Sequence, residues 1–290
     1  MTAIVILNFN NVEDTINCIE SVQAHNTADA IFFVVDNGST RIDAVAILQN
    51  DLESMFKTDF QILKDDYRGN DFRLCNLILS NTNDGYACGN NKALNMIFAS
   101  KMFDAIMILN NDVIFIQDII PTLIKKLNTL PNCGIVSPIL YHKDMSGIDY
   151  NCARKNHRDV DFLKIYLLLK RNFFNFEKKE TDKWYILKNL SEFENRDAIQ
   201  IEMPSGSCML INTCLFQKLG GFDPNTFLYF EENILHKKIE SLGYKNYLIP
   251  SLKCIHLGGM STAKSSSYFI NIKGLESAWY YGTRYTSLNK

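Results

Sequence analysis

The sequence predicts an α/β fold with a mostly parallel central sheet flanked by helices, and two features of the chain support this. Short apolar runs alternate with stretches of helical periodicity through the first half of the chain. Several of these runs end in polar clusters, as strands do at the edge of a sheet. The alternation itself is typical of β-α-β units, whose helices cover both faces of a parallel sheet.

The predicted elements follow one another as strand, helix and strand. Residues 3–7 are an apolar run of strand length, and the next segment repeats its apolar residues Val12, Ile16 and Ile19 every three or four positions. The later apolar runs are also short enough for buried strands. The expected strands are 3–7, 30–35, 60–63, 105–109, 208–211 and 247–249. The expected helices are 12–22, 45–56, 93–98, which is entered through a loop at 81–91, and one from the acidic turn at 231–232 to 243–244.

The bulk composition is that of an ordinary globular protein. Of the 290 residues, 47% are hydrophobic and 21% charged, and a formal net charge of -2 argues against nucleic-acid binding. We expect one domain over residues 1–261, with a basic and aromatic insertion at about 142–197, and a tail over 262–290.

The N-terminus and the cysteines predict a cytoplasmic protein. The first residues are apolar but lack the basic segment of a secretory signal, so they are interpreted as a strand. The eight cysteines form no Cys-x-x-Cys pair, and we expect reduced thiols rather than disulfides or a zinc site.

Polar clusters follow three of the predicted strands, at 8–11, 36–39 and 110–112. In open α/β sheets ligands bind beyond the carboxyl ends of the strands, so these clusters are candidate binding residues. Asp36 could accept hydrogen bonds from a nucleotide base or ribose. A helix cap or a tight Asn-Gly turn is the alternative interpretation of Asp36.

Asp112 is the candidate metal ligand, because it places a carboxylate directly after the buried strand 105–109. Mg²⁺ and Mn²⁺ prefer oxygen ligands and are often shared between carboxylates and substrate phosphates. His256 ends the last predicted strand and could complete the metal shell through its imidazole. For both residues a capping or surface role is the alternative.

Glu231 and Glu232 are the candidate general bases. They follow the aromatic-rich segment 227–230, and a carboxylate beside apolar rings has a raised pKa that suits proton abstraction. The alternative is the first turn of a helix, where acidic residues are favoured by the helix dipole.

The loop 83–91 is a candidate for close approach to a ligand, because Gly85 lacks a side chain. It has no Lys-Ser/Thr pair and is therefore no P-loop. The first strand ends in Asn-Phe-Asn-Asn and not in Gly-x-Gly-x-x-Gly, which counts against a dinucleotide-dependent oxidoreductase.

In their order along the chain these segments closely resemble family 2 glycosyltransferases of the GT-A fold, especially the bacterial rhamnosyltransferase-like members that build surface polysaccharides. The resemblance covers about residues 3–261. The segments that carry it are 5–10, 34–39, 83–91, 109–113, 206–207, 220–223, 227–232, 243–244 and 256–261.

The resemblance implies an inverting hexosyl or rhamnosyl transfer in one displacement, from a UDP- or dTDP-sugar to a saccharide acceptor, with Mg²⁺ or Mn²⁺. A lipid-linked acceptor and peripheral contact with the cytoplasmic face of the inner membrane are expected as well. Asp112 and His256 would be metal ligands, and Glu232 the base, with Glu231 as its rival. The expected nucleotide-sugar-binding residues are Asn8, Asn10, Asp36, Asn83, Gly85, Asn90, Asn110 and Asn111.

Three residues depart from the family pattern. Asn110 replaces the first acid of the Asp-x-Asp motif, so less negative charge faces the metal. Glu232 replaces an Asp and is longer by one methylene, which leaves Glu231 as an alternative base. Ile234 replaces a second acid. A catalytically inactive nucleotide-sugar-binding module is therefore one alternative function, and a nucleotidyltransferase is another, although the first strand lacks its basic Gly-rich signature.

The insertion and the tail are candidate membrane contacts. Basic residues over 154–179 surround the aromatic and apolar segments 162–169 and 173–176, and the tail offers a second candidate in 278–281 with Arg284 and Tyr285, including Trp279, Tyr280 and Tyr281. Such surfaces suit anionic membranes. A solvated helical hairpin that packs on the main domain is the alternative. The oligomeric state is left open.

Overall fold

The structure, a computed structural model, describes residues 1–156, 166, 185–187, 193–258 and 267–287. Most of the predicted insertion therefore lies outside the described residues. The segment that was expected to contact a membrane lies largely in this part of the chain. Within the part of the chain that is described, no helix is both long and apolar enough to cross a membrane.

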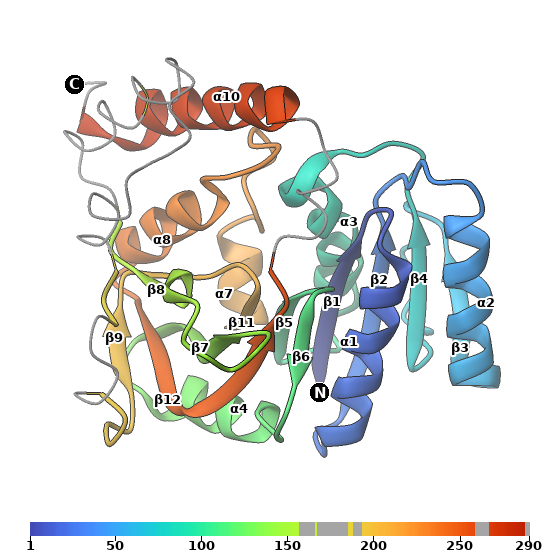
Figure 1. Cartoon of the computed structure of the whole chain (residues 1–290), viewed down its shortest axis with the longest axis horizontal. Coiled ribbons are helices and arrows are strands. Elements are labelled where there is room, and N and C mark those ends of the chain that lie inside the picture. Colours follow the sequence, from blue (N-terminus) through green and yellow to red (C-terminus); the bar gives the residue numbers. More distant parts are fainter. Residues whose placement is uncertain (157–165, 167–184, 188–192, 259–266, 288–290) are drawn as a thin grey trace.

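A large sheet runs through the molecule with helices on both faces (Figure 1), as predicted. Its strand order is β3-β4-β2-β1-β5-β11-β7-β12-β6, and β9 pairs with β12 outside this path. The five strands from β3 to β5 are parallel, and β11 runs antiparallel to both β5 and β7. The strands are β1 (Thr2–Asn8), β2 (Ala30–Asp36), β3 (Phe60–Leu63), β4 (Cys75–Leu79), β5 (Ala105–Asn110), β6 (Val113–Phe115), β7 (Cys133–His142), β9 (Ile199–Ile201), β11 (Cys208–Asn212) and β12 (Lys245–His256). A small separate sheet pairs β8 (Ala153–Arg154) with β10 (Met203–Pro204).

The helices divide between the two faces because successive strand residues point to opposite sides. Ile4 and Ile6 of β1 pack with α1, α2 and α4, whereas Ala3 and Val5 pack with α3, α7 and α8. The described helices of four or more residues are α1 (Val12–His25), α2 (Ala44–Phe56), α3 (Gly85–Ser100), α4 (Ile120–Thr129), α7 (Thr213–Lys218), α8 (Glu231–Ser241) and α10 (Ser267–Tyr285). All eight cysteines are free thiols.

The structure differs from the sequence prediction at the start of α3. The expected loop 81–91 is helical from Gly85 onward. Two glycines and three asparagines within 83–91 have poor helix propensity, but tertiary contacts override it. The Tyr86 N–H donates to the carbonyl of Phe227 at 2.8 Å, and Ala87 is fully buried in the core. Strands β4, β6 and β7 and helix α4 were not predicted, and β12 is longer than the predicted 247–249.

Helix α10 lies across α8 near the top of the view in Figure 1. Phe230, Ile234, Ala278 and Tyr281 form a small core between the two helices. Of the aromatic residues predicted as a membrane contact in the tail, Tyr281 is fully buried, whereas 57% of Trp279 is exposed.

Gly85 supports a prediction about stability. Its φ is +80°, and a Cβ atom there would lie 2.3 Å from the carbonyl oxygen of Phe227. We expect Gly85→Ala to lower the free energy of unfolding by about 2–5 kcal/mol, from the left-handed backbone and the clash together. Gly220 is the matched control, because its φ is +77° but nothing lies within 4 Å of the added atom. Gly220→Ala should cost only about 1–2 kcal/mol. Urea unfolding measures both, and equal losses would contradict the assigned clash.

Candidate active site

The polar clusters after β1, β2 and β5 meet at one edge of the sheet, because these strands are parallel and in register. Asn8 pairs with Asp36 across β1 and β2, and Leu7 pairs with Asn110 across β1 and β5. The predicted parallel topology placed these strand ends at one edge of the sheet. The observed strand register shows which of their residues are neighbours.

Asp36 is held by three donors from this edge. The Nδ2 of Asn8 donates to Oδ2 of Asp36 at 2.7 Å, and the hydroxyl and N–H of Ser39 donate at 2.6 and 2.9 Å. Only 1% of Asp36 is exposed. Oδ1 of Asn10 accepts from the N–H groups of Thr40 and Arg41, which ties the loop after β2 to the end of β1. These bonds give the loop a defined shape around Asp36.

Asn37, which belongs to the candidate cluster 36–39, joins this edge to the start of α3. Its Nδ2 donates to Oδ1 of Asn83 and to the carbonyl of Gly85, both at 3.0 Å, and its Oδ1 accepts from the N–H of Asp84. An Asn-Gly pair after a strand usually indicates a turn, so this contact could not be predicted from the sequence. Asn90 lies one turn into α3, buried, with its Nδ2 bonded to the carbonyl of Tyr86.

Asp112, His256 and Asp149 form a chain of three side chains beside β5. Oδ1 of Asp112 lies 3.4 Å from Nε2 of His256, whose Nδ1 lies 2.8 Å from Oδ2 of Asp149. Burial lowers the pKa of His256, but the two carboxylates outweigh it and raise that pKa to about 10. Hydrogen bonds from His256 and Asn151 outweigh burial at Asp149 and hold its pKa below the ordinary value. Asp149 falls within the predicted insertion, and no motif there identified it.

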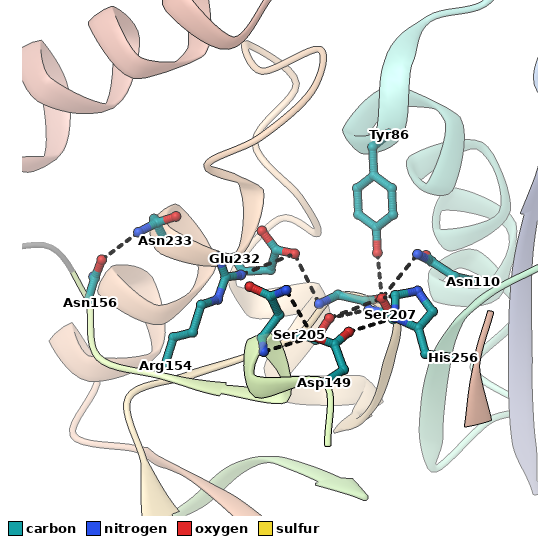
Figure 2. A network of polar contacts seen from close by, with 12 residues as sticks. Tyr86, Asn110, Asp149, Arg154, Asn156, Ser205, Ser207, Glu232, Asn233 and His256 are labelled. Carbon is teal, nitrogen blue, oxygen red and sulfur yellow. Dashed lines mark hydrogen bonds and ion pairs between the residues drawn. The ribbon is translucent and has the colours of Figure 1, made fainter. Parts of the chain in front are cut away.

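Ser207 connects this chain of side chains to the end of β5, as Figure 2 shows. Its hydroxyl lies 3.4 Å from Nε2 of His256 and accepts from Nδ2 of Asn110 at 3.2 Å. Asn111 points elsewhere: its Nδ2 donates to the carbonyl of Asn11 and to the hydroxyl of Thr15. The contacts of Asn111 are thus with the start of α1.

The residues around Asp112 fit a divalent metal that takes most of its ligands from a substrate. Oδ1 of Asp112 is buried, makes no hydrogen bond and lies 3.4 Å from Nε2 of His256, so a divalent ion bound there would replace the proton of His256. His256 has the carboxylate partner on its second ring nitrogen that orients metal-binding histidines. Within the described residues, no group of three or more His, Cys, Asp and Glu side chains is placed to hold a metal. The two side chains here that could contribute to such a site are Asp112 and His256.

Glu232 lies on the other side of the Ser205–Ser207 turn (Figure 2). Its Oε1 accepts from the N–H of Gly206 at 3.0 Å and lies 4.0 Å from the guanidinium of Arg154. Tyr86 donates its hydroxyl to the Gly206 carbonyl at 2.8 Å. A Cβ at Gly206 would lie 2.8 Å from both Glu232 Oε1 and the Tyr86 hydroxyl, so a larger residue here would displace the ends of these two side chains. Arg154 is thus a neighbour of Glu232, although the sequence prediction placed it in a segment expected to contact a membrane.

Glu231 differs sharply from its neighbour Glu232. Glu231 is 4% exposed, and its Oε1 makes no hydrogen bond. Burial and the charge of Glu232 raise the pKa of Glu231 to about 8, so its carboxyl is neutral at pH 7. The side chain of Glu232 keeps 20% of its surface exposed and is therefore the more accessible carboxylate.

The raised pKa of Glu231 predicts a pH-dependent stability. The neutral carboxyl is favoured in the folded protein, so the stabilisation is complete below the unfolded pKa near 4.5 and is lost as pH rises towards about 8. We expect Glu231→Gln to gain stability relative to wild type by up to about 1.4 kcal/mol per pH unit over that range, and no further above it. Thermal unfolding of both proteins between pH 5 and pH 9 measures the gap. A gap that does not widen with pH would contradict the buried neutral carboxyl.

Known structures resemble this chain over most of its length, whereas the sequence match to a known protein covers only a short part of it. No model of a protein family matches the chain. N-acetylglucosaminyl-diphospho-decaprenol L-rhamnosyltransferase of two Mycobacterium tuberculosis strains is 33% identical over 60 residues. This match spans 21% of the chain and 20% of the rhamnosyltransferase, so the chain covers about a fifth of that relative's length.

Two solved structures resemble the whole fold. GalNAc-T7 with UDP, GalNAc and Mn²⁺ superposes with a TM-score of 0.60 at 12% identity, over 88% of this chain and 43% of that one. The mannosyltransferase PcManGT from Pyrobaculum calidifontis, with GDP-Man and Mn²⁺, gives a TM-score of 0.55 at 14% identity, over 98% of this chain and 70% of that one. The architecture is therefore the GT-A glycosyltransferase fold.

Proposed function

We propose that the chain is a metal-dependent inverting glycosyltransferase that moves a sugar from a nucleoside-diphosphate donor to a saccharide acceptor. One observation carries the proposal. On a GT-A fold, His256 and the accessible carboxylate of Glu232 lie on opposite sides of one short turn, 205–207 (Figure 2), and the carboxylate of Asp112 lies 3.4 Å from Nε2 of His256. Asp112 with His256 suits a diphosphate, and Glu232 suits an acceptor hydroxyl.

The donor nucleotide would occupy the edge formed by the ends of β1, β2 and β5. Asp36 and the loop held by Asn8 and Asn10 would contact the base or ribose. Asn83, Gly85 and Asn90 would shape the wall at the start of α3, and Asn110 the floor beneath the diphosphate, whereas Asn111 would support the start of α1 from behind. The hydrogen bonds among these residues support pre-organisation, which reduces the cost of ordering the loops on binding.

Asp112 and His256 would hold Mg²⁺ or Mn²⁺. When bound, the ion supplies positive charge next to the diphosphate that leaves during transfer. The neutral Asn110, in place of an acid, lowers the negative charge of the protein at this point. We therefore infer that metal binding depends on the nucleotide more strongly here than at a site with two acids.

Glu232 would act as the general base. It takes the proton from the acceptor hydroxyl, whose oxygen forms a bond to the anomeric carbon as the bond from that carbon to the diphosphate breaks. Attack from the face opposite the leaving group inverts the anomeric configuration. Glu231, being neutral and buried, would instead support the start of α8.

The acceptor is proposed to be a lipid-linked saccharide in surface polysaccharide assembly, and the donor a UDP- or dTDP-sugar. The partial match to an enzyme named for a decaprenol-diphosphate acceptor supports this class. Residues 1–261 would be the catalytic domain, acting at the cytoplasmic face of the inner membrane, with the insertion and tail as contacts to it.

A donor screen tests the function. Release of nucleoside diphosphate from UDP-, dTDP- and GDP-sugars is measured with Mg²⁺, with Mn²⁺ and with a chelator. The proposal expects release from one donor class that requires the metal and rises when a matching acceptor is added. Tight binding of a nucleotide sugar without any release or transfer would support the inactive binding module, which Asn110 and Ile234 make the second candidate.

A further inference from the structure

The loop before the proposed base holds a strained backbone. Tyr229 and Phe230 are consecutive non-glycine residues with φ of +71° each. This left-handed region is unfavourable for bulky side chains and persists where the surrounding structure imposes it, often at functional sites. The strain lies directly before Glu231 and Glu232, where α8 begins.

The two aromatic rings of the strained loop differ in exposure. Phe230 is 8% exposed and stacks on Tyr281 of α10 with ring centroids 5.3 Å apart. Tyr229 is 45% exposed. Burial of Phe230 anchors the loop on α10, whereas a large part of Tyr229 stays open to solvent.

Helix α10 carries a glycine where the ring of Tyr229 lies. A Cβ at Gly274 would lie 3.2 Å from Cδ2 and 3.7 Å from Cε2 of Tyr229, which is tighter than ordinary contact. Glycine in the interior of a helix weakens it, so its presence here needs a reason. Without a side chain at Gly274, the ring rests on the helix backbone and keeps a large part of its surface free.

The neighbouring rings connect Tyr229 to the proposed donor site. Phe227 meets Phe269 of α10 edge to face at 5.5 Å, and Nζ of Lys273 lies 5.3 Å from the Phe227 ring. The carbonyl of Phe227 accepts from the N–H of Tyr86, whose hydroxyl contacts the turn that holds Glu232. The loop 227–230 thus spans from the start of α3 to the proposed base.

We propose that the exposed ring of Tyr229 is a stacking subsite for the acceptor saccharide. Sugar rings present C–H groups on one face, and these are attracted to the negative face of an aromatic ring. The ring stands three residues before Glu232, so a sugar stacked on it would be oriented with respect to the proposed base. This inference rests on the proposed function and names the residue that selects the acceptor.

Saturation-transfer difference NMR tests the subsite on the full chain with UDP and Mg²⁺ present. The probes are the methyl glycosides of glucose, galactose, rhamnose and N-acetylglucosamine, with saturation applied to the aromatic protons. At least one glycoside should receive saturation on one face of its ring. Tyr229→Phe should keep the signal because the ring is retained, and Tyr229→Ala should reduce it at least fivefold. Trp279→Ala is the matched control, because Trp279 is an exposed aromatic residue of α10 whose ring lies near Tyr166 instead, and the glycoside signal of this variant should be unchanged.

Two results would overturn the subsite. One is the absence of a face-selective signal from every glycoside with the wild-type chain, and the other is an equal signal with Tyr229→Ala. Flotation with phosphatidylglycerol vesicles forms a second arm: loss of flotation in Tyr229→Ala together with an unchanged glycoside signal would assign the ring to a membrane. Binding of UDP and dTDP, measured by calorimetry in the same samples, tests the donor site. Binding of either nucleotide together with a failed glycoside test removes the subsite alone, whereas a wild-type chain that binds neither nucleotide removes the proposed function.

Discussion

Asp112→Asn is expected to lower the rate of sugar transfer by about 10³-fold and to remove its dependence on metal. The substitution keeps the size of the side chain and removes its charge at an oxygen that makes no hydrogen bond in the structure. Metal ions contribute several kcal/mol to charge stabilisation in a transition state, which corresponds to this loss. Asp112→Asn also relieves the repulsion between a carboxylate and an incoming diphosphate, so nucleotide binding without metal should be retained.

Calorimetry of UDP and dTDP binding gives a readout that is independent of activity. In wild type, Mg²⁺ or Mn²⁺ should increase the affinity for the preferred nucleotide at least tenfold, and in Asp112→Asn the metal should have little effect. Asp144→Asn is the control, because Asp144 is an exposed carboxylate bonded to Ser146 in the turn after β7. A metal effect that persists in Asp112→Asn would remove Asp112 from the metal site and leave His256 without a partner ligand.

Glu232→Gln is expected to reduce kcat by about 10²–10⁴-fold while donor binding stays within twofold of wild type. General bases contribute about this much to catalysis. Glutamine can still accept the hydrogen bond from the Gly206 N–H through its amide oxygen, so the turn 205–207 should keep its conformation. The loss would then reflect the missing proton acceptor rather than a displaced loop.

Glu231→Gln is the matched comparison, since it makes the same chemical change one residue earlier. Glu231 is already neutral at pH 7 and buried, so we expect kcat to fall by less than about fivefold. Single-turnover transfer and nucleotide binding are measured for both variants at the same pH. If Glu231→Gln is the slow variant and Glu232→Gln transfers normally, the base is Glu231.

Local sequence was sufficient for the elements with a clear pattern. The buried strands 30–35 and 105–109 are unbroken apolar runs, and β2 and β5 form at these positions. The predicted start of helix α3, at residue 93, was wrong, because the segment Gly85 to Asn91 has little helix propensity of its own. Its conformation depends on Phe227, a residue more than a hundred positions away. Local patterns hold no information about such a contact.

The residues of the candidate site also fall into two groups, those that the sequence indicated and those that only the structure identified. A polar residue directly after an apolar strand indicates a position at the ligand-binding edge, and this was enough to select Asp36, Asp112 and His256. Asp149 and Arg154 lie in a segment without clear periodicity, and the sequence offered no reason to place them near the other residues. The structure brings Asp149 to His256 and Arg154 to Glu232 because β7 and β8 turn back towards β12 and α8.

By itself the sequence determined the α/β class, the strands whose ends carry polar residues, and the small set of carboxylates and one histidine suited to the chemistry. These follow from periodicity and residue type, which act over a few positions. Only the tertiary structure distinguished Glu231 from Glu232, because burial and hydrogen bonding depend on the packing of α8 against β10 and α10. It also decided that Tyr229 is exposed and Phe230 buried, since two strained residues keep that arrangement only while Tyr281 of α10 covers Phe230.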